Sequence, residues 1–288
     1  MSAEAHQRRA PIRSITAILP AYNEAGNLGP VVQATLEALS DVVPSFDLIV
    51  VDDGSTDGTR RIGEELALAH PEVRVVHLPR RQGYGSAIRA GLGAATRQYV
   101  FLMDADRQYE PADLAHLVQW DDSYDVIWGY RPHRRDALPR VVLDFVYKVA
   151  ARLMFGLKAR DMNCGFKLIR GSTLAGLTLH STGIALNAEI LVRAQHGGAA
   201  LRETGVRHYP RRPGEARGGT FWTQVRTVRE LVALRRELTK ERRLARSAAR
   251  PTVAAPSQGV APGDGSTPLP TTPAPEPQEP PDAAQAPQ

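Results

Sequence analysis

The chain has 288 residues, 42% of them hydrophobic, which suits one large or two small globular domains and excludes a fibrous protein. Its formal net charge of +5 favours anionic partners such as a nucleotide, a phospholipid surface or a nucleic acid. Cys164 is the only cysteine, so an intramolecular disulfide and a cysteine-based zinc site are excluded, and we expect a buried, inert thiol.

The N-terminal segment is polar and basic and lacks the apolar core of a signal peptide. No apolar run in the sequence approaches the roughly 18 residues that a membrane-spanning helix needs. We therefore expect a flexible N-terminus at residues 1–13 and a cytoplasmic protein.

Three strand–loop–helix units come next. Apolar strands are expected at residues 14–20, 46–51 and 73–78, each followed by a polar loop and a helical pattern. The second strand ends in the acids Asp52 and Asp53, and the third leads into a basic loop that contains Gly83. Alternating strands and helices predict an open, mostly parallel sheet that binds ligands at the carboxyl ends of its strands.

The central stretch is residues 99–108, an apolar run that ends in Asp104 and Asp106. Its pattern predicts a strand buried on both faces. In an extended segment these carboxylates lie on the same side and can reach one ion, with Gln108 as a further ligand from the same edge. Oxygen ligands of this kind suit Mg²⁺ or Mn²⁺. The alternative is that the acids turn the chain and cap the next helix.

The loop around Gly83 also has two interpretations. It forms a turn for steric reasons, or it binds a phosphate at a helix N-terminus with added charge from Arg80 and Arg81. Its spacing fits neither the dinucleotide-binding fingerprint nor a Walker loop. Asp52 and Asp53 are candidates for accepting hydrogen bonds from a nucleobase, although one of them could cap the following helix.

Four motifs, in this order, resemble those of glycosyltransferase family 2: Pro20-Ala21-Tyr22-Asn23-Glu24, Val51-Asp52-Asp53-Gly54-Ser55-Thr56-Asp57-Gly58-Thr59, Gly83-Tyr84-Gly85-Ser86-Ala87 and Asp104-Ala105-Asp106-Arg107-Gln108. The resemblance is closest to the polyprenyl-phosphate (dolichyl-phosphate) mannosyl- and glucosyltransferase branch. It implies a GT-A type nucleotide-diphospho-sugar transferase fold with one Rossmann-like sheet. It also implies a catalytic domain at residues 14–220, with a nucleotide-sugar half at about 14–130 and an acceptor half at about 131–220.

The resemblance implies a set of site residues. We expect nucleotide contacts from Pro20, Tyr22, Glu24, Asp52, Asp53, Gly83 and Ala105. Asp104, Asp106 and Gln108 are the expected ligands of Mg²⁺ or Mn²⁺ on the donor diphosphate. The sequence departs from the branch at Arg107-Gln108-Tyr109, where Leu-Gln-His is common, but the metal ligands are intact.

The implied chemistry breaks the anomeric C–O bond of a nucleotide-sugar, so a metal and arginines must stabilise the leaving diphosphate. The expected catalytic residues are Asp104, Asp106, Asp161 and Arg131. A lipid phosphate acceptor is already anionic near neutral pH and needs no dedicated base. A sugar hydroxyl acceptor would require a base such as Asp161.

Arginines are frequent where an anionic acceptor would need them. They either form a clamp that binds the acceptor phosphate or belong to solvated loops. They are Arg131, Arg134, Arg135, Arg140, Arg211, Arg212 and Arg217. Arg131 and Arg211 fall where the family has phosphate-binding arginines. We expect the acceptor phosphate to contact Arg131, Arg140, Arg211 and Arg212.

The acceptor half contains a helical pattern at residues 138–157 with a wide apolar face and basic flanks. It is either a core helix or a helix that lies in the membrane interface. Residues 161–168 resemble the family's Asp-x-x-Ser/Cys-Gly-Phe segment, in which Gly165 could simply form a turn. The following helix is expected at residues 183–192, with Glu189 facing the site.

The C-terminal part departs from the family, which often continues into membrane-spanning helices. Residues 221–246 predict one basic amphipathic helix that packs on the domain, dimerises or binds an anionic membrane surface; we favour peripheral membrane attachment. Residues 247–288 are rich in Ala and Pro with few large apolar residues, which predicts a disordered tail.

Together these features predict a metal-dependent, inverting glycosyltransferase on the cytoplasmic face of the membrane, which moves mannose or glucose from GDP-mannose or UDP-glucose to polyprenyl phosphate. The alternatives are a family 2 transferase to a hydroxyl acceptor, with Asp161 as base, and an inactive nucleotide-sugar-binding or scaffolding module. We do not expect a nucleic-acid partner, because the arginines are not interleaved with stacking aromatics.

Overall fold

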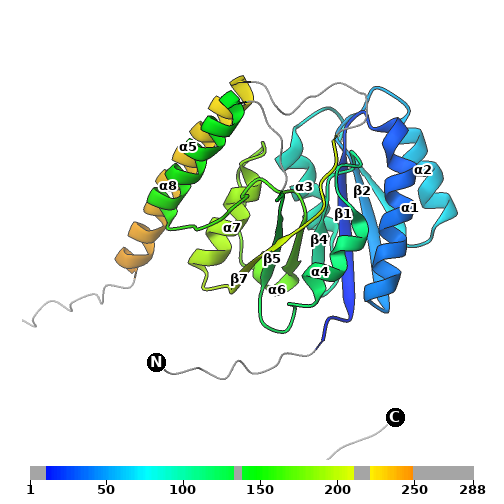
Figure 1. The fold of residues 1–288 in the computed structure, drawn as a ribbon, viewed down its shortest axis with the longest axis horizontal. Coiled ribbons are helices and arrows are strands. Elements are labelled where there is room, and N and C mark those ends of the chain that lie inside the picture. The colour runs from blue at the N-terminus through cyan, green and yellow to red at the C-terminus, as the bar shows by residue number, and fades with distance from the viewer. Residues whose placement is uncertain (1–10, 133–137, 211–220, 249–288) are drawn as a thin grey trace, which may run out of the picture. The chain divides into compact units, whose positions relative to one another are not determined.

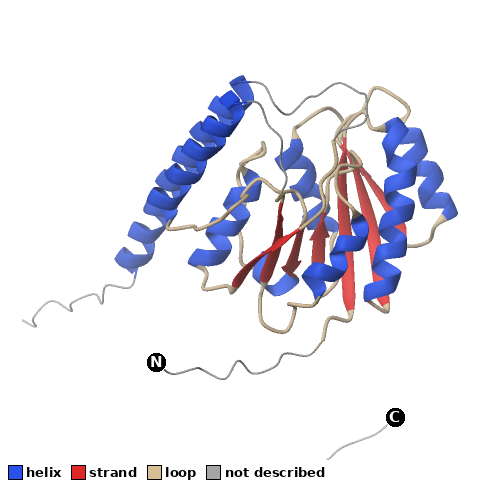
Figure 2. Cartoon of the chain, viewed as in Figure 1, coloured by secondary structure: helices blue, strands red, loops and turns tan. Residues whose placement is uncertain are grey.

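The computed structural model describes residues 11–132, 138–210 and 221–248 (Figure 1). These residues form a seven-stranded sheet flanked by helices (Figure 2). The strands are β1 (Ser14–Ala21), β2 (Ser45–Asp52), β3 (Val73–His77), β4 (Tyr99–Leu102), β5 (Val126–Tyr130), β6 (Lys167–Arg170) and β7 (Leu201–Gly205). The helices are α1 (Ala25–Val42), α2 (Thr59–Ala69), α3 (Tyr84–Ala94), α4 (Leu114–Val118) after the 3₁₀ turn η1 (Pro111–Asp113), α5 (Leu138–Phe155), α6 (Gly171–Ala175), α7 (Leu186–His196) and α8 (Phe221–Ala248). The expected α/β fold is confirmed.

The sheet has the strand order β3-β2-β1-β4-β6-β5-β7. Strands β3, β2, β1 and β4 are parallel, whereas β6 runs antiparallel to both β4 and β5, and β7 is parallel to β5. Leu102, at the end of β4, pairs with Lys167, at the start of β6. The segment before β6 therefore lies beside the acidic loop that follows β4.

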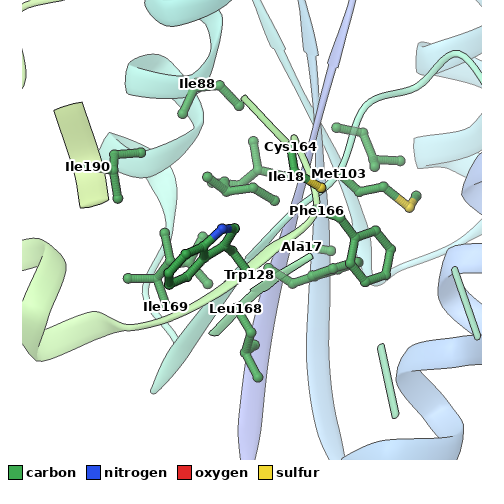
Figure 3. Close-up of a cluster of buried hydrophobic side chains, with 14 of the residues drawn as sticks. Ala17, Ile18, Ile88, Met103, Trp128, Cys164, Phe166, Leu168, Ile169 and Ile190 are labelled. Carbon is green, nitrogen blue, oxygen red and sulfur yellow. The ribbon is translucent and has the colours of Figure 1, made fainter. Parts of the chain in front are cut away.

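The core lies where the central strands meet the helices. Figure 3 shows Ile18 of β1 among side chains that come from β5, β6, α3 and α7. The ring of Phe101 in β4 meets that of Phe166 edge to face at 4.8 Å between centroids. Cys164 is buried and free in this cluster, and burial raises the pKa of its thiol, as expected for an inert cysteine.

Helix α5 has one buried and one exposed apolar face. Tyr147, Ala151 and Phe155, four residues apart, are buried in the core. Phe145 and Leu153 lie on the other face and are 66% and 80% exposed. The buried face fits the interpretation as a core helix, whereas the membrane interpretation stays a prediction for the large exposed apolar surface. No helix in the described part of the chain is both long and apolar enough to cross a bilayer.

Helix α8 packs on the domain. Leu231, Leu234 and Leu238 repeat at helical spacing and are buried in the same core. Among the side chains of this helix that the structure describes, the exposed basic residues are Arg229, Arg235, Arg236, Lys240 and Arg243. Of the expected flexible N-terminus at residues 1–13 and the expected disordered tail at residues 247–288, residues 1–10 and 249–288 lie outside the described residues. Ile12 is buried in the core, and α8 continues to Ala248.

Helix α3 provides a test of the sheet packing. Gly91 faces β1 and β2, and a Cβ at this position would stand 2.5 Å from Ile18 Cγ2 and 3.1 Å from Val51 Cγ2. Gly91→Ala is expected to lower the free energy of unfolding by about 1–3 kcal/mol, because the buried neighbours must shift. Urea denaturation measures the change.

The matched control lies on the same helix. A Cβ at Gly93 meets nothing within 4 Å, so Gly93→Ala is expected to raise the free energy of unfolding by up to about 1 kcal/mol through helix propensity. Equal effects of the two substitutions would contradict the close packing of α3 on the sheet.

Candidate active site

The first two strand-end loops are joined by hydrogen bonds. Ala21 and Asp52 are paired at the carboxyl ends of β1 and β2. Beyond them, the amide of Asn23 donates to Ser55 Oγ at 3.0 Å, and the amide of Glu24 donates to Thr59 Oγ1 at 2.7 Å. Asn23 adopts a left-handed φ of 54°, which asparagine tolerates. The expected nucleoside-binding motifs therefore form one structural unit.

Asp52 and Asp53 both order the surrounding loops. Asp53 accepts hydrogen bonds from the amides of Gln82 at 2.6 Å and Gly83 at 2.9 Å. Asp52 accepts one from the amide of Ser55 at 2.9 Å and faces His77 Nδ1 at 3.2 Å. Their contact with a nucleobase stays a prediction, but the structure shows a further role for each.

The basic loop before α3 approaches the first motif. The guanidinium of Arg81 lies 4.4 Å from the centre of the Tyr22 ring, a cation–π distance. Gly54 has a φ of +67°, and its Cα lies against the backbone of Arg80, where a side chain would clash. Glycine is thus required where the second and third loops cross, and Tyr22, Arg81 and Asp53 come together at this edge.

The N-terminus of α3 is filled by the protein itself. The amide of Gly83 donates to Asp53, and the amide of Gly85 donates to the carbonyl of Thr182 at 2.9 Å. Gly83 has a φ of +98°, and a Cβ there would stand 2.9 Å from the Thr182 carbonyl oxygen. Of the two interpretations of this loop, the structure favours the turn, because these amides are engaged and do not face a phosphate.

The acidic loop after β4 turns sharply. Arg107 has a left-handed φ of 60°, and the amide of Gln108 then donates to Asp106 Oδ1 at 3.2 Å. The side-chain amide nitrogen of Gln108 donates to the carbonyl of Tyr209 at 3.1 Å. Ala105, between the two acids, is buried. The loop is thus held both by its own backbone and by the strand-like segment near Tyr209.

Asp104 depends on the neighbouring Gly165. A Cβ at Gly165 would stand 2.6 Å from both carboxylate oxygens of Asp104, so only glycine leaves room for this carboxylate. Gly165 is thus more than a turn residue. Its amide donates to the hydroxyl of Tyr109 at 3.2 Å, and the Tyr109 ring packs on Phe166.

The donor set fits a hard divalent cation. Asp104, Asp106 and the amide oxygen of Gln108 are all oxygen donors from one loop, and Gly165 provides the space beside Asp104. The described residues contain no cluster of three or more His, Cys, Asp or Glu side chains with metal-binding geometry. A Mg²⁺ ion with these donors would keep further coordination positions for oxygen atoms of a substrate, because its geometry is octahedral.

A buried polar network lies behind this loop, and the sequence did not reveal it. Lys167 is fully buried, and its Nζ donates to the carbonyl of Cys164 and, at 2.7 Å, to Asn187 Oδ1. Burial lowers the pKa of Lys167 to about 8. Asn187 Nδ2 in turn donates to the Tyr84 hydroxyl at 3.4 Å, and burial followed by the charge of Asp104 raises the pKa of Tyr84. The sequence feature that could have indicated this network is Lys167, a lysine at the start of an apolar strand.

Arg131 and Asp161 form a two-pronged ion pair. Arg131 Nε donates to Asp161 Oδ2 at 2.5 Å and Nη2 to Oδ1 at 3.0 Å, and the side chains are only 12% and 7% exposed. Burial opposes the charge on Arg131, but Tyr109 and Asp161 outweigh it and raise the pKa of the guanidinium. A carboxylate engaged in this way through both oxygens is a poor proton acceptor.

The other expected acceptor residues are not all described. Arg211 and Arg212, and also Arg134, Arg135 and Arg217, lie outside the described residues. Arg140 lies in the first turn of α5, and its side chain is outside the described part. Of the expected nucleotide and metal residues, Pro20 and Asp52 lie at the ends of β1 and β2. The others lie in the loops that follow β1, β2, β3 and β4 at the same edge of the sheet.

The fold defines a class of protein. The structure matches glucosyl-3-phosphoglycerate synthase from Mycobacterium tuberculosis, solved with Mn²⁺, UDP-glucose and phosphoglyceric acid, with a TM-score of 0.59, 23% sequence identity and coverage of 77% of this chain and 80% of that one. At this identity the match shows the fold, which is of the GT-A type. Residues 16–176 match the model of glycosyl transferase family 2. The chain belongs to this family and is a glycosyltransferase.

Its named relatives act on polyprenyl phosphates. The chain is 29% identical over 214 residues to an undecaprenyl-phosphate mannosyltransferase from Micrococcus luteus, covering 70% of this chain and 86% of that protein. It is 31% identical over 180 residues to a dodecaprenyl-phosphate galacturonate synthase from Rhizobium johnstonii, covering 59% of this chain and 52% of that protein. The chain thus spans most of the first relative and about half of the second.

Gly165→Ala tests whether the space beside Gly165 positions the carboxylate of Asp104. The added methyl group must displace the carboxylate, and a misplacement of about 1 Å can cost on the order of 100-fold in rate. We expect about this loss of sugar transfer, with circular dichroism unchanged. Gly176→Ala is the control, because its Cβ would make an ordinary contact of 3.6 Å with the Thr173 carbonyl oxygen. Wild-type activity in Gly165→Ala would contradict this geometry.

Proposed function

We propose that the chain transfers mannose or glucose from a nucleotide-diphosphate sugar to a polyprenyl phosphate, with inversion at the anomeric carbon and with Mg²⁺ or Mn²⁺ as cofactor. The family assignment supports sugar transfer, and the names of the two relatives support the acceptor class. The Mn²⁺ complex of the structural neighbour supports the cofactor.

The Arg131–Asp161 ion pair is the observation that favours a phosphate acceptor over a hydroxyl acceptor. A hydroxyl acceptor must lose a proton, and the carboxylate suited to take it is already bound through both oxygens to Arg131. A lipid phosphate carries its negative charge before it reaches the enzyme, so it needs a positive group to position it. The permanently charged Arg131 serves this purpose, and Asp161 orients Arg131.

The reaction is then a single displacement. An oxygen of the lipid phosphate attacks the anomeric carbon, the C–O bond to the diphosphate breaks, and the nucleoside diphosphate leaves. When bound, the metal would supply Lewis-acid stabilisation of that leaving group. Asp104, Asp106 and Gln108 would hold the metal, and the loops around Tyr22 and Asp53 would hold the nucleoside.

Nucleoside diphosphate release tests this proposal. UDP-glucose and GDP-mannose are supplied in Mg²⁺ or Mn²⁺, with and without vesicles that contain polyprenyl phosphate. Wild-type release is expected to depend on the lipid phosphate and on the metal. Asp104→Asn combined with Asp106→Asn is expected to lower it by about 100-fold or more, the size of effect that follows loss of transition-state charge stabilisation.

The control removes two carboxylates elsewhere. Glu37 and Asp41 are exposed on α1, and Glu37→Gln combined with Asp41→Asn is expected to leave release unchanged. Release that ignores the lipid phosphate but follows an added sugar hydroxyl would contradict the proposed acceptor.

We also propose that the protein attaches peripherally to the cytoplasmic face of the membrane, where a polyprenyl phosphate is reached. Helix α5 presents Phe145, Val146, Val149 and Leu153, which are all at least 39% exposed. The exposed charged residues of α8 are mostly basic and suit anionic headgroups. In the view of Figure 1 both helices lie at the end of the sheet opposite α2.

Vesicle sedimentation tests this attachment. Phe145→Ser combined with Leu153→Ser is expected to reduce binding to anionic vesicles at least tenfold, because each buried CH₂ contributes about 0.8 kcal/mol. The control is Leu68→Ser on α2, where an equally apolar side chain is 90% exposed on another helix. Equal losses from both changes, or none from either, would contradict a role of α5.

A further inference from the structure

The loop between α6 and α7 packs on the donor side of the site. Its residue Thr182 accepts a hydrogen bond from the amide of Gly85 at 2.9 Å, and a Cβ at Gly85 would stand 2.5 Å from the Ser181 carbonyl oxygen. From α3, Arg89 Nη1 donates to the His180 carbonyl at 2.7 Å and to that of Ser181 at 3.3 Å. The loop, residues 179–183, therefore sits directly on α3, and the amides of the two residues before this helix donate to Asp53.

Glu189 holds the same loop from α7. Its carboxylate accepts hydrogen bonds from the amides of His180 at 3.0 Å and Ser181 at 2.7 Å. Burial would raise the pKa of Glu189, but the hydrogen bonds from Ser181, Arg193 and His180 outweigh it and lower the pKa. The expectation that Glu189 faces the site is thus corrected, because its carboxylate is buried and anchors the loop.

Arg193 connects Glu189 to α8. Its Nε donates to Glu189 at 2.9 Å, and its Nη atoms reach Glu241 at 3.1 Å and Glu237 at 3.5 Å. The Arg193 side chain is only 7% exposed, so its charge depends on these carboxylates.

The acids of α8 all lie on this side of the helix. They are Glu230, Glu237 and Glu241. A Cβ at Gly183, in the loop, would stand 2.9 Å from Glu230 Oε2. The exposed positions around the rest of α8 are mostly basic. The charge pattern of α8 thus matches one orientation of the helix, with its acids toward α7 and the loop.

We infer that Arg193 is a positioning residue: through it, α8 orders the loop of residues 179–183, and this loop sets the affinity of the site for the nucleotide-sugar. The inference rests on the proposed function for its second half, since the site beside the loop is the proposed donor site. Helix α8 is then part of the donor-binding machinery as well as a membrane-facing element. Loss of the contacts between α8 and Arg193 is therefore expected to disturb the loop and, beyond it, the hydrogen bond from the amide of Gly83 to Asp53.

The experiment replaces the two acids of α8 that contact Arg193 with neutral residues. Glu237 and Glu241 are 43% and 49% exposed, so Glu237→Gln combined with Glu241→Gln leaves no cavity in the core. The thermal transition verifies that the fold is retained. Hydrogen exchange by mass spectrometry follows the loop peptide, and steady-state kinetics follow UDP-glucose and GDP-mannose. We expect about tenfold faster exchange in the loop and a KM for the donor raised about tenfold, with kcat within twofold of wild type.

Two further variants separate positioning from general stability. Arg193→Lys keeps one ion pair and is expected to restore most of the loop protection and of the donor KM relative to Arg193→Met. Glu37→Gln combined with Asp41→Asn changes exposed charges on α1, away from α8 and the loop, and is expected to alter neither quantity.

The outcomes are distinct. Unchanged exchange in the loop, or faster exchange with an unchanged donor KM, would overturn the inference. A fall in kcat with an unchanged KM would also overturn it. If the wild type turns over neither nucleotide-sugar, the proposed function fails, and the exchange data alone then decide whether α8 orders the loop.

Discussion

The antiparallel pairing of β6 with β4 is the constraint on which the site depends. It sets Lys167 opposite Leu102, so that Gly165 comes against the carboxylate of Asp104. Residues about sixty positions apart thereby form one wall, where the proposed acceptor half of the chain meets the loop that is proposed to bind the metal. A parallel strand at this position would carry its preceding segment to the far edge of the sheet.

Several buried charges near this wall are paired in the part of the chain that the structure describes. Lys167 has two oxygen partners, Arg131 and Asp161 hold each other, and Glu189 with Arg193 binds loop amides and the acids of α8. Buried charges are costly unless they are paired, so these networks tie the loops to fixed positions. This accounts for a site built mostly on loops that nevertheless keeps its geometry.

The sequence predicted the parts of the fold that are local. The strands before Asp52 and Asp104 follow from apolar runs that end in acids, and they occur where the pattern places them. The insertion of β6 between β4 and β5 was not predicted, because antiparallel pairing across a long helical segment leaves no local signal. Likewise, the pattern of α5 could not decide between core and membrane, since the helix has apolar residues on both faces.

Site prediction had the same limit. Residue types and spacing placed the expected metal ligands and the expected nucleoside loops at one edge. They did not reveal the partners of Asp53 and Asp161, which are about 30 residues away in sequence, or those of Glu189, which are an arginine and loop amides within nine residues. Those contacts change the role expected of each acid, which residue identity alone cannot show.

The most direct test is the acid stability of the product made from polyprenyl phosphate and a nucleotide-sugar that carries a radiolabel in its sugar. A glycosyl phosphate ester releases its sugar in mild acid, whereas an ordinary glycoside resists it. The account predicts a lipid-extractable product whose label is released by mild acid. A product that keeps its label under these conditions would contradict it, because the acceptor would then be a hydroxyl group.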